Sequence, residues 1–255
     1  MPDQPAEFHV HTALSWCAAR AMSVASITAE AEQAGLSLVG LADHLWLDPK
    51  RGSRPSIDRL LTLREATSRP GPVKLLLGAE ADCAPHAGLA GGESVKVLDY
   101  VIAAYHFTDV RHGATPAART VEDLARLQLA GFRSLLQPPH VTIAGHPFYI
   151  PPTIFHNLPD DVQHHMREVF ALVARGAGPL FAEAKAKGIA IELNAKALGP
   201  RHRDVLGPVI LLAKEAGCRF VLSSDAHLPG EVGRSQSLLA YAASLGMTTT
   251  DFLSL

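Results

Sequence analysis

The stretch EFHVHT, residues 7–12, has apolar residues at alternate positions and ends on two histidines separated by one residue. Five further apolar runs also close on His, Asp or Glu: LVGLADH (38–44), KLLLGAE (74–80), YVIAAYH (100–106), VTIAGHP (141–147) and FVLSSDAH (220–227). Such runs are typical of strands in a buried parallel sheet. Because the carboxyl ends of parallel strands converge on one rim, six histidines, one glutamate and one aspartate are predicted to meet there.

Segments with helical spacing of apolar residues separate these runs. The predicted helices cover residues 23–34, 56–68, 120–130, 159–175, 179–187, 208–216 and 235–245, and a seventh short run, IAIELN (189–194), lies between the fifth and sixth of them. Gly35 and Gly188 follow two of these helices, as expected for C-terminal caps. Seven strands that alternate with helices favour a closed or nearly closed barrel. The alternative is a doubly wound open sheet, but that fold usually concentrates its site at one switch point, whereas here five or six strand ends carry polar residues.

Length and composition predict one domain, residues 1–255. Hydrophobic residues make up 47% of the chain and charged residues 19%, which is enough apolar material for one large core. The formal net charge of −2 gives no general attraction to nucleic acid or to an anionic membrane. No apolar stretch is long enough to cross a bilayer and no signal-peptide pattern is present, so we expect a cytoplasmic protein. Cys17, Cys83 and Cys218 have neither zinc-ribbon nor disulfide spacing, so we expect reduced thiols.

The polar residues at the strand ends carry a family resemblance. In chain order they read His9-Val10-His11-Thr12, Ala42-Asp43-His44, Gly78-Ala79-Glu80, Tyr105-His106-Phe107, Gly145-His146-Pro147 and Ser224-Asp225-Ala226-His227. This series resembles the polymerase-and-histidinol-phosphatase (PHP) superfamily, and the match spans residues 7–233. The pieces LDYVIAAYHF, IELNAKAL and LSSDAHLPGEVG look most like stand-alone histidinol-phosphatase-type members. The proofreading domains attached to bacterial DNA polymerases are a poorer fit.

The resemblance implies an α/β fold, a single-domain distorted (β/α)7 TIM-like barrel with a metal site at the C-terminal ends of its strands. It implies two or three divalent ions, zinc, manganese or iron. The implied ligands are His9, His11, Glu80 and Asp225 for one ion, Glu80, His106 and His146 for a second, and His44 with His227 for a third. Imidazole suits zinc or iron, and a carboxylate can bridge two ions.

The expected activity is hydrolysis of a phosphoester, with a metal-bridging hydroxide as the nucleophile and with Glu80, Asp225 and His227 as the catalytic residues. A phosphomonoesterase is the first expectation, and histidinol phosphate, from histidine biosynthesis, is its leading named substrate. Two alternatives remain open from the sequence. One is a phosphodiesterase or nuclease-type activity on nucleotides, and the other is a metal-binding regulatory protein without turnover.

Two positions depart from the pattern of the superfamily. The first motif commonly begins with Asp, where this chain has Glu7, which is longer by one methylene. A further His or Asp usually follows the second His by six residues, and here that position is Cys17. Cys17 is therefore predicted either to ligate a third metal ion or to leave that site weak. A third reading is that Cys17 is a buried small hydrophobic residue.

A phosphate group requires positive or N–H donor groups around its oxygens. Lys196, Arg201 and Arg203 follow the IELNA run, and Arg20 follows the first run. Lys196, Arg201 and Arg20 are the candidate substrate-binding residues, with solvated loop charges as the alternative. Glu192 and Asn194 are expected to support the ligands or the fold rather than to bind metal. The expected partner is a small phosphorylated substrate, and neither nucleic acid nor a membrane.

Overall fold

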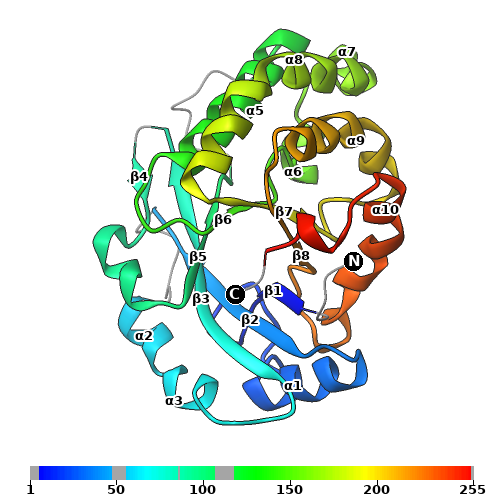
Figure 1. The fold of residues 1–255 in the computed structure, drawn as a ribbon. Coiled ribbons are helices and arrows are strands. Elements are labelled where there is room, and N and C mark those ends of the chain that lie inside the picture. The colour runs from blue at the N-terminus through cyan, green and yellow to red at the C-terminus, as the bar shows by residue number, and fades with distance from the viewer. Residues whose placement is uncertain (1–5, 48–55, 86, 107–117, 254–255) are drawn as a thin grey trace.

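The computed structural model describes residues 6–47, 56–85, 87–106 and 118–253. Within these ranges, seven parallel strands follow one another in chain order around a nearly closed barrel (Figure 1). They are β1 (Ala6–Val10), β2 (Leu38–Leu45), β3 (Lys74–Ala84), β5 (Tyr100–Ala104), β6 (Ile143–Gly145), β7 (Ala190–Asn194) and β8 (Phe220–Ser223). The short β4 (Gly88–Leu89) pairs antiparallel with the end of β3. The predicted barrel is confirmed, and the open doubly wound sheet is wrong.

The seam between β1 and the chain after β8 nearly closes the ring and forms part of the site. The Asp225 N–H donates to the His9 carbonyl at 2.9 Å, and the His11 N–H donates to the Ala226 carbonyl at 3.0 Å. On its other side, β1 pairs with β2, and the register shifts between Glu7 and Val10. Such an irregularity re-aims neighbouring side chains. The seam therefore places the first and the last sequence motifs next to each other.

Apolar side chains fill the barrel toward the N-terminal ends of the strands. This part of the core contains Phe8, Leu38, Ala42, Tyr100, Ile102, Ile143, Ala190 and Val221. The Tyr100 side chain occupies the space over Gly40 and Gly78, where an added Cβ would lie 2.3 Å from its hydroxyl and 2.4 Å from its ring, respectively. The Tyr100 hydroxyl donates to the Phe8 carbonyl at 2.7 Å. A packed interior beneath the rim leaves the opposite ends of the strands as the place for chemistry.

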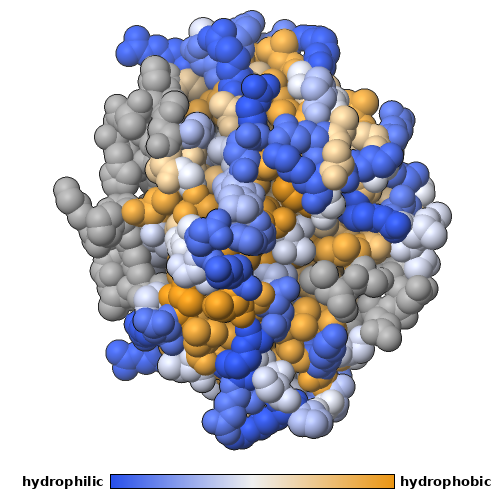
Figure 2. All heavy atoms as spheres, turned by 60° about the vertical axis from the view of Figure 1, so that its left-hand side comes forward, coloured by the Kyte–Doolittle hydropathy of each residue, from blue (hydrophilic) through white to orange (hydrophobic). Residues whose placement is uncertain are grey.

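Helices surround this sheet (Figure 1). They are α1 (Val24–Gln33), α2 (Ile57–Leu61), α3 (Arg64–Thr67), α5 (Val121–Leu136), α6 (Pro152–Phe155), α7 (Asp160–His164), α8 (Met166–Lys187), α9 (Pro200–Glu215) and α10 (Leu239–Ser244), with 3-10 turns η1 (Gly92–Val97), η2 (Pro229–Glu231), η3 (Arg234–Leu238) and η4 (Thr249–Asp251). In the described residues, no helix is both long and apolar enough to cross a membrane. On the face shown in Figure 2, hydrophobic groups alternate with hydrophilic ones.

Several predicted helix boundaries are wrong. The helix predicted at 120–130 continues to Leu136 as α5, the one predicted at 159–175 is divided between α7 and α8, and the one predicted at 235–245 is divided between η3 and α10. Residues 56–68 form two short helices, α2 and α3, rather than one. The predicted break before Pro179 is absent, because α8 continues through that proline. Gly176 lets α8 approach Leu129 of α5 closely, and the buried face of the helix continues beyond the proline, so packing outweighs the lost backbone hydrogen bond. Similarly, α9 begins at Pro200 and contains Pro208.

Candidate metal centre

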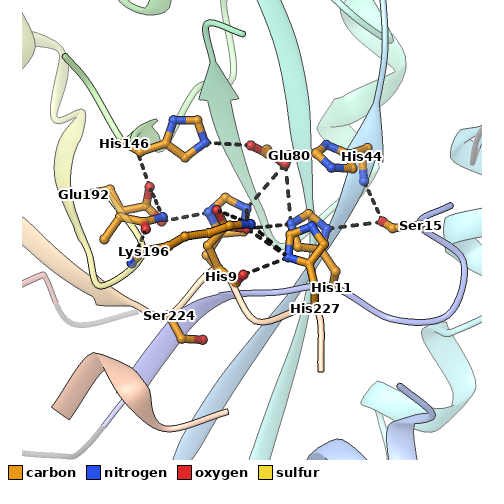
Figure 3. A network of polar contacts seen from close by, with 12 residues as sticks. His9, His11, Ser15, His44, Glu80, His146, Glu192, Lys196, Ser224 and His227 are labelled. Carbon is orange, nitrogen blue, oxygen red and sulfur yellow. Dashed lines mark hydrogen bonds and ion pairs between the residues drawn. The ribbon is translucent and has the colours of Figure 1, made fainter. Parts of the chain in front are cut away.

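The structure brings together the eight predicted polar residues from the strand ends. Glu80, on β3, lies at their centre (Figure 3). Its Oε1 is 3.0 Å from His106 Nε2 and 2.9 Å from His146 Nε2. Its Oε2 is 2.6 Å from His44 Nδ1 and 3.5 Å from His9 Nε2. The two oxygens of one buried carboxylate thus face two different sets of imidazoles.

Asp225 forms the second acidic point of the cluster. Its Oδ1 lies 3.1 Å from His11 Nε2, 3.9 Å from His9 Nε2 and 3.4 Å from His227 Nδ1. Asp225 has a φ of 58°, and His146 has a φ of 25°. Residues other than glycine rarely occupy this left-handed region, and such strain is frequent at functional sites. The backbone conformation is therefore energetically unfavourable at two of the residues that face the centre.

Each of four histidines has a hydrogen-bond acceptor next to its Nδ1 atom. The pairs are His9 with Glu192 at 2.8 Å, His11 with Ser15 at 3.2 Å, His106 with Asp82 at 2.5 Å and His227 with the Asp225 carbonyl at 2.8 Å. The Ser15 hydroxyl donates to Asp43, so it accepts from the ring. With the proton on Nδ1, the lone pair of each ring is on Nε2. This arrangement is typical of histidines that bind metal.

The donor set fits divalent metal ions. Four groups of three side chains have ligand atoms within 4.8 Å of one another: His9-His11-Asp225, His44-Glu80-His106, His11-His44-His227 and His9-His146-Glu192. Within the described part of the chain, His9 Nε2, His44 Nδ1 and Glu80 Oε2 are buried without a partner in hydrogen-bonding geometry. Buried polar atoms are rarely left so. Nitrogen and carboxylate ligands with free lone pairs suit zinc, manganese or iron.

The electrostatics of Glu80 and His106 favour a cation. Burial opposes ionisation of Glu80, but the charges of His44 and His106 hold the pKa of this carboxyl well below its ordinary value. Burial also opposes protonation of His106, but Glu80 and Asp82 outweigh it and raise the pKa of His106 to about 10. The carboxylates therefore create a buried negative potential at the rim.

The same balance holds on the β1 side. Burial opposes protonation of His9, but Glu192 and Glu80 raise the pKa of His9 well above its ordinary value. Burial opposes ionisation of Asp225, and the charges of His9 and His11 hold its pKa well below its ordinary value. Positive charge is thus stabilised on both sides of Glu80.

The two departures from the superfamily pattern do not join the cluster. The hydrogen bonds of Glu7 come from Ser224, Ser235 and the Gly233 N–H and not from the histidines. Cys17 is half-buried, and among the described residues no group of three ligand atoms within 4.8 Å includes it. Burial, with Glu80, raises the pKa of the Cys17 thiol to about 12. The group of ligand atoms that contains His44 and His227 has His11 as its third member. Cys17 as a ligand stays a prediction, with its thiol close enough to Glu80 and Asp225 for their charges to raise its pKa.

The basic residues that follow the first and seventh strands differ in their positions relative to the cluster. Lys196 is half-exposed, and its Nζ lies 3.5 Å from Asp225 Oδ2 and 3.4 Å from His227 Nδ1. Arg20 is exposed in the turn that follows β1. Arg201 lies in the first turn of α9, but its side chain is outside the described residues, as is Phe107. Arg203 donates to the Leu198 carbonyl and lies over the Tyr241 ring, so it serves packing.

Sequence reasoning missed the roles of Asp82, Ser15 and Asp43. Asp82 is 1% exposed and contacts His106, and Asp43 accepts from Thr12 and Ser15. A signal for Asp82 was present, because Glu80 and Asp82 are two residues apart and side chains at that spacing share one face of a strand. The predicted run ended at Glu80, whereas β3 continues to Ala84.

Comparison with known proteins gives structural relatives only. No family model and no curated protein matches the chain. The histidinol phosphate phosphatase HisK from Lactococcus lactis subsp. lactis Il1403, solved with zinc, L-histidinol and phosphate, aligns with a TM-score of 0.63 and 16% identity over 94% of both chains. The putative histidinol phosphatase HisK from Listeria monocytogenes aligns with a TM-score of 0.56 and 14% identity over 92% of this chain and 99% of that one. The chain therefore has the fold of these proteins.

Proposed function

We propose that this chain is a metal-dependent phosphomonoesterase of the PHP superfamily, folded as one domain over residues 1–255. The observation that carries the proposal is the cluster around Glu80. Six imidazoles and two carboxylates converge there, and three of their ligand atoms are buried without a hydrogen-bond partner in the described structure. Buried polar atoms rarely lack a partner in hydrogen-bonding geometry, and a bound cation would supply one.

The proposed ligands fall into three groups around the shared glutamate. His9, His11, Glu80 and Asp225 hold one ion, and Glu80, His106 and His146 hold a second. His44 and His227 contribute to a third. This assignment is supported by the distances from each oxygen of Glu80 to different imidazoles. When bound, such ions activate a water molecule and polarise the phosphoryl group.

The side chains of the protein supply position and charge. Glu80 and Asp225 lie on both sides of the imidazoles and maintain a negative field that retains cations. Asp225, His106 and His227 have side chains that are 10%, 15% and 17% exposed, whereas His9, His11 and Glu80 are almost completely buried. Substrate therefore reaches the centre from the side of Asp225, His106 and His227.

Lys196 lies on that accessible side. Its Nζ is within 3.5 Å of Asp225 and its side chain is 49% exposed, so its charge is available to a phosphate oxygen at the edge of the centre. Phosphate binding by lysine is a point-charge interaction that tolerates a flexible approach. Arg20 and Arg201 are proposed as further phosphate contacts, on their positions in the turn after β1 and the first turn of α9.

Histidinol phosphate is the proposed substrate. The proposal is supported by the sequence motifs and by the HisK relative that was solved with L-histidinol and phosphate. A cytoplasmic role in histidine biosynthesis would follow from this substrate.

The test is a turnover assay of the metal-loaded protein with zinc, manganese or iron. The panel contains histidinol phosphate, a generic aryl phosphate and a generic phosphodiester. The proposal expects hydrolysis of monoesters, lost on chelation and restored by added metal. Hydrolysis of the diester alone would replace the proposed class, and no hydrolysis with any ion would refute it.

A further inference from the structure

Glu192 on β7 connects two of the proposed ligands that come from other strands. Its side chain is completely buried. One oxygen, Oε1, accepts from His9 Nδ1 at 2.8 Å, and the other, Oε2, accepts from the backbone N–H of His146 at 2.5 Å (Figure 3). Asn194 Nδ2 donates to the same Oε2 at 3.3 Å. A single carboxylate thus links the end of β1 to the chain after β6.

The contact with His9 selects its tautomer. Because an ionised carboxylate only accepts hydrogen bonds, the His9 proton lies on Nδ1 and the lone pair lies on Nε2. That Nε2 faces Glu80 Oε2 at 3.5 Å and Asp225 Oδ1 at 3.9 Å. The opposite tautomer would point a proton into the proposed metal position. Glu192 therefore prepares His9 as a ligand.

The contact with His146 holds an unusual backbone. The φ of His146 is 25°, a value that a residue with a Cβ rarely adopts. Its N–H is fixed by Glu192, and in this conformation its Nε2 reaches Glu80 Oε1 at 2.9 Å. Without an acceptor for this N–H, the peptide would be free to relax and would move the imidazole from Glu80.

We propose that Glu192 is a positioning residue that prepares two metal ligands at once, His9 through its tautomer and His146 through its backbone. This inference rests on the proposed function, in which these histidines bind different ions. Glu192 contacts neither substrate nor reacting atoms. Its loss weakens metal binding by about 10- to 100-fold, the range typical of carboxylates that orient metal-bound histidines.

The variant Glu192→Gln separates this role from simple packing. A glutamine has the same shape but only one acceptor oxygen, so it can accept from His9 Nδ1 or from the His146 N–H, but not from both. One of the two ligands is therefore released whichever way the amide turns. The matched control is Glu7→Gln, which also removes a buried carboxylate from a barrel strand, but one that accepts hydrogen bonds from Ser224, Ser235 and Gly233.

Two readouts test the proposal. Competition with a chromophoric chelator measures the zinc affinity of the wild type and both variants, with circular dichroism as the check on folding. We expect zinc affinity to fall about 10- to 100-fold in Glu192→Gln and to stay within about twofold in Glu7→Gln. Equal zinc affinities in the two variants would overturn the proposal.

The second readout requires no variant at position 192. Long-range proton–nitrogen NMR of the zinc-loaded wild type, with His9 assigned through His9→Gln, should show the His9 proton on Nδ1. A proton on Nε2 would overturn the proposal even if Glu192→Gln fails to fold. Wild-type protein that binds no zinc would refute the proposed function as well. Zinc binding and turnover that are unchanged in Glu192→Gln would refute this inference alone.

Discussion

Two buried glutamates on the strands of the barrel have opposite surroundings. Glu7 and Glu80 are 0% and 1% exposed. Glu7 accepts hydrogen bonds from two serine hydroxyls and two backbone N–H groups, and burial still raises its pKa to about 7. Glu80 is surrounded by imidazole nitrogens, and its pKa lies well below its ordinary value in spite of burial.

The partners of each carboxylate, and not its burial, separate a structural role from a metal-binding one. Both carboxylate oxygens of Glu7 accept hydrogen bonds, and these bonds connect β1 to the chain after β8. Glu80 is left with one oxygen that has no hydrogen-bond partner in the described residues, next to nitrogens with the same deficit. The expected consequence is that Glu7 contributes to stability and Glu80 to metal binding.

The largest expected effect is that of Glu80→Ala. Because both Glu80 oxygens face proposed ligands, its loss should lower kcat/KM for phosphomonoesters by more than about 10³-fold. Circular dichroism should show a folded protein, since the surrounding imidazoles are held by their own partners. If Glu80→Ala keeps a kcat/KM within tenfold of the wild type, Glu80 would have no metal-binding role that distinguishes it from Glu7.

A smaller effect is expected for Lys196→Met. This variant removes the charge beside Asp225 and His227, and kcat/KM should fall by about 10- to 100-fold, as is typical for loss of a hydrogen bond to a charged group. Metal content should stay unchanged, because Lys196 binds no metal. A parallel loss of metal would show instead that Lys196 supports the centre.

The next effect is on stability and concerns Glu7→Gln. In the folded metal-free protein the pKa of Glu7 is about 7, against an ordinary value of 4.5. The folded state therefore binds the proton more tightly than the unfolded state does. The contribution of Glu7 to the free energy of unfolding falls as pH rises from 4.5 to 7. The loss amounts to roughly 3 kcal/mol across that window.

Denaturant unfolding at pH 5 and pH 8 tests this sign. The wild type should lose more stability than Glu7→Gln on going from pH 5 to pH 8, whereas turnover by the metal-loaded variant should stay within a few-fold. Equal pH slopes would contradict the assignment of a raised pKa to Glu7.

The smallest effect is expected far from both glutamates, at Thr120→Ala. The Thr120 hydroxyl accepts from the Asp123 N–H at 3.1 Å and caps α5. Its loss should lower the free energy of unfolding by about 1 kcal/mol. Metal content and kcat/KM should remain those of the wild type, which makes this variant a control for general destabilisation.

The sequence predicted the parts of the molecule that follow from local pattern. The strand ends, the barrel and the convergence of His9, His44 and Glu80 all follow from short apolar runs that close on polar residues. Gly188 ends α8 with a φ of 69°, as its position after the helix predicted.

Features that depend on tertiary packing could not be predicted in this way. Pro179 lies inside α8 because the helix packs against α5. The residues next to Pro179 in the sequence do not indicate this packing. Glu7 turns toward Ser224 and Ser235, which are more than 200 residues away in sequence. The place of Cys17 outside the ligand groups likewise depends on the path of the turn after β1.

Elemental analysis shows whether the cluster around Glu80 binds metal. Wild type, Glu7→Gln and Glu80→Ala would each be loaded with zinc, dialysed and counted for metal per chain. We expect two or three ions in the wild type and in Glu7→Gln, and at least one fewer in Glu80→Ala. Less than one ion per chain in the wild type, or equal counts in all three proteins, would contradict this expectation.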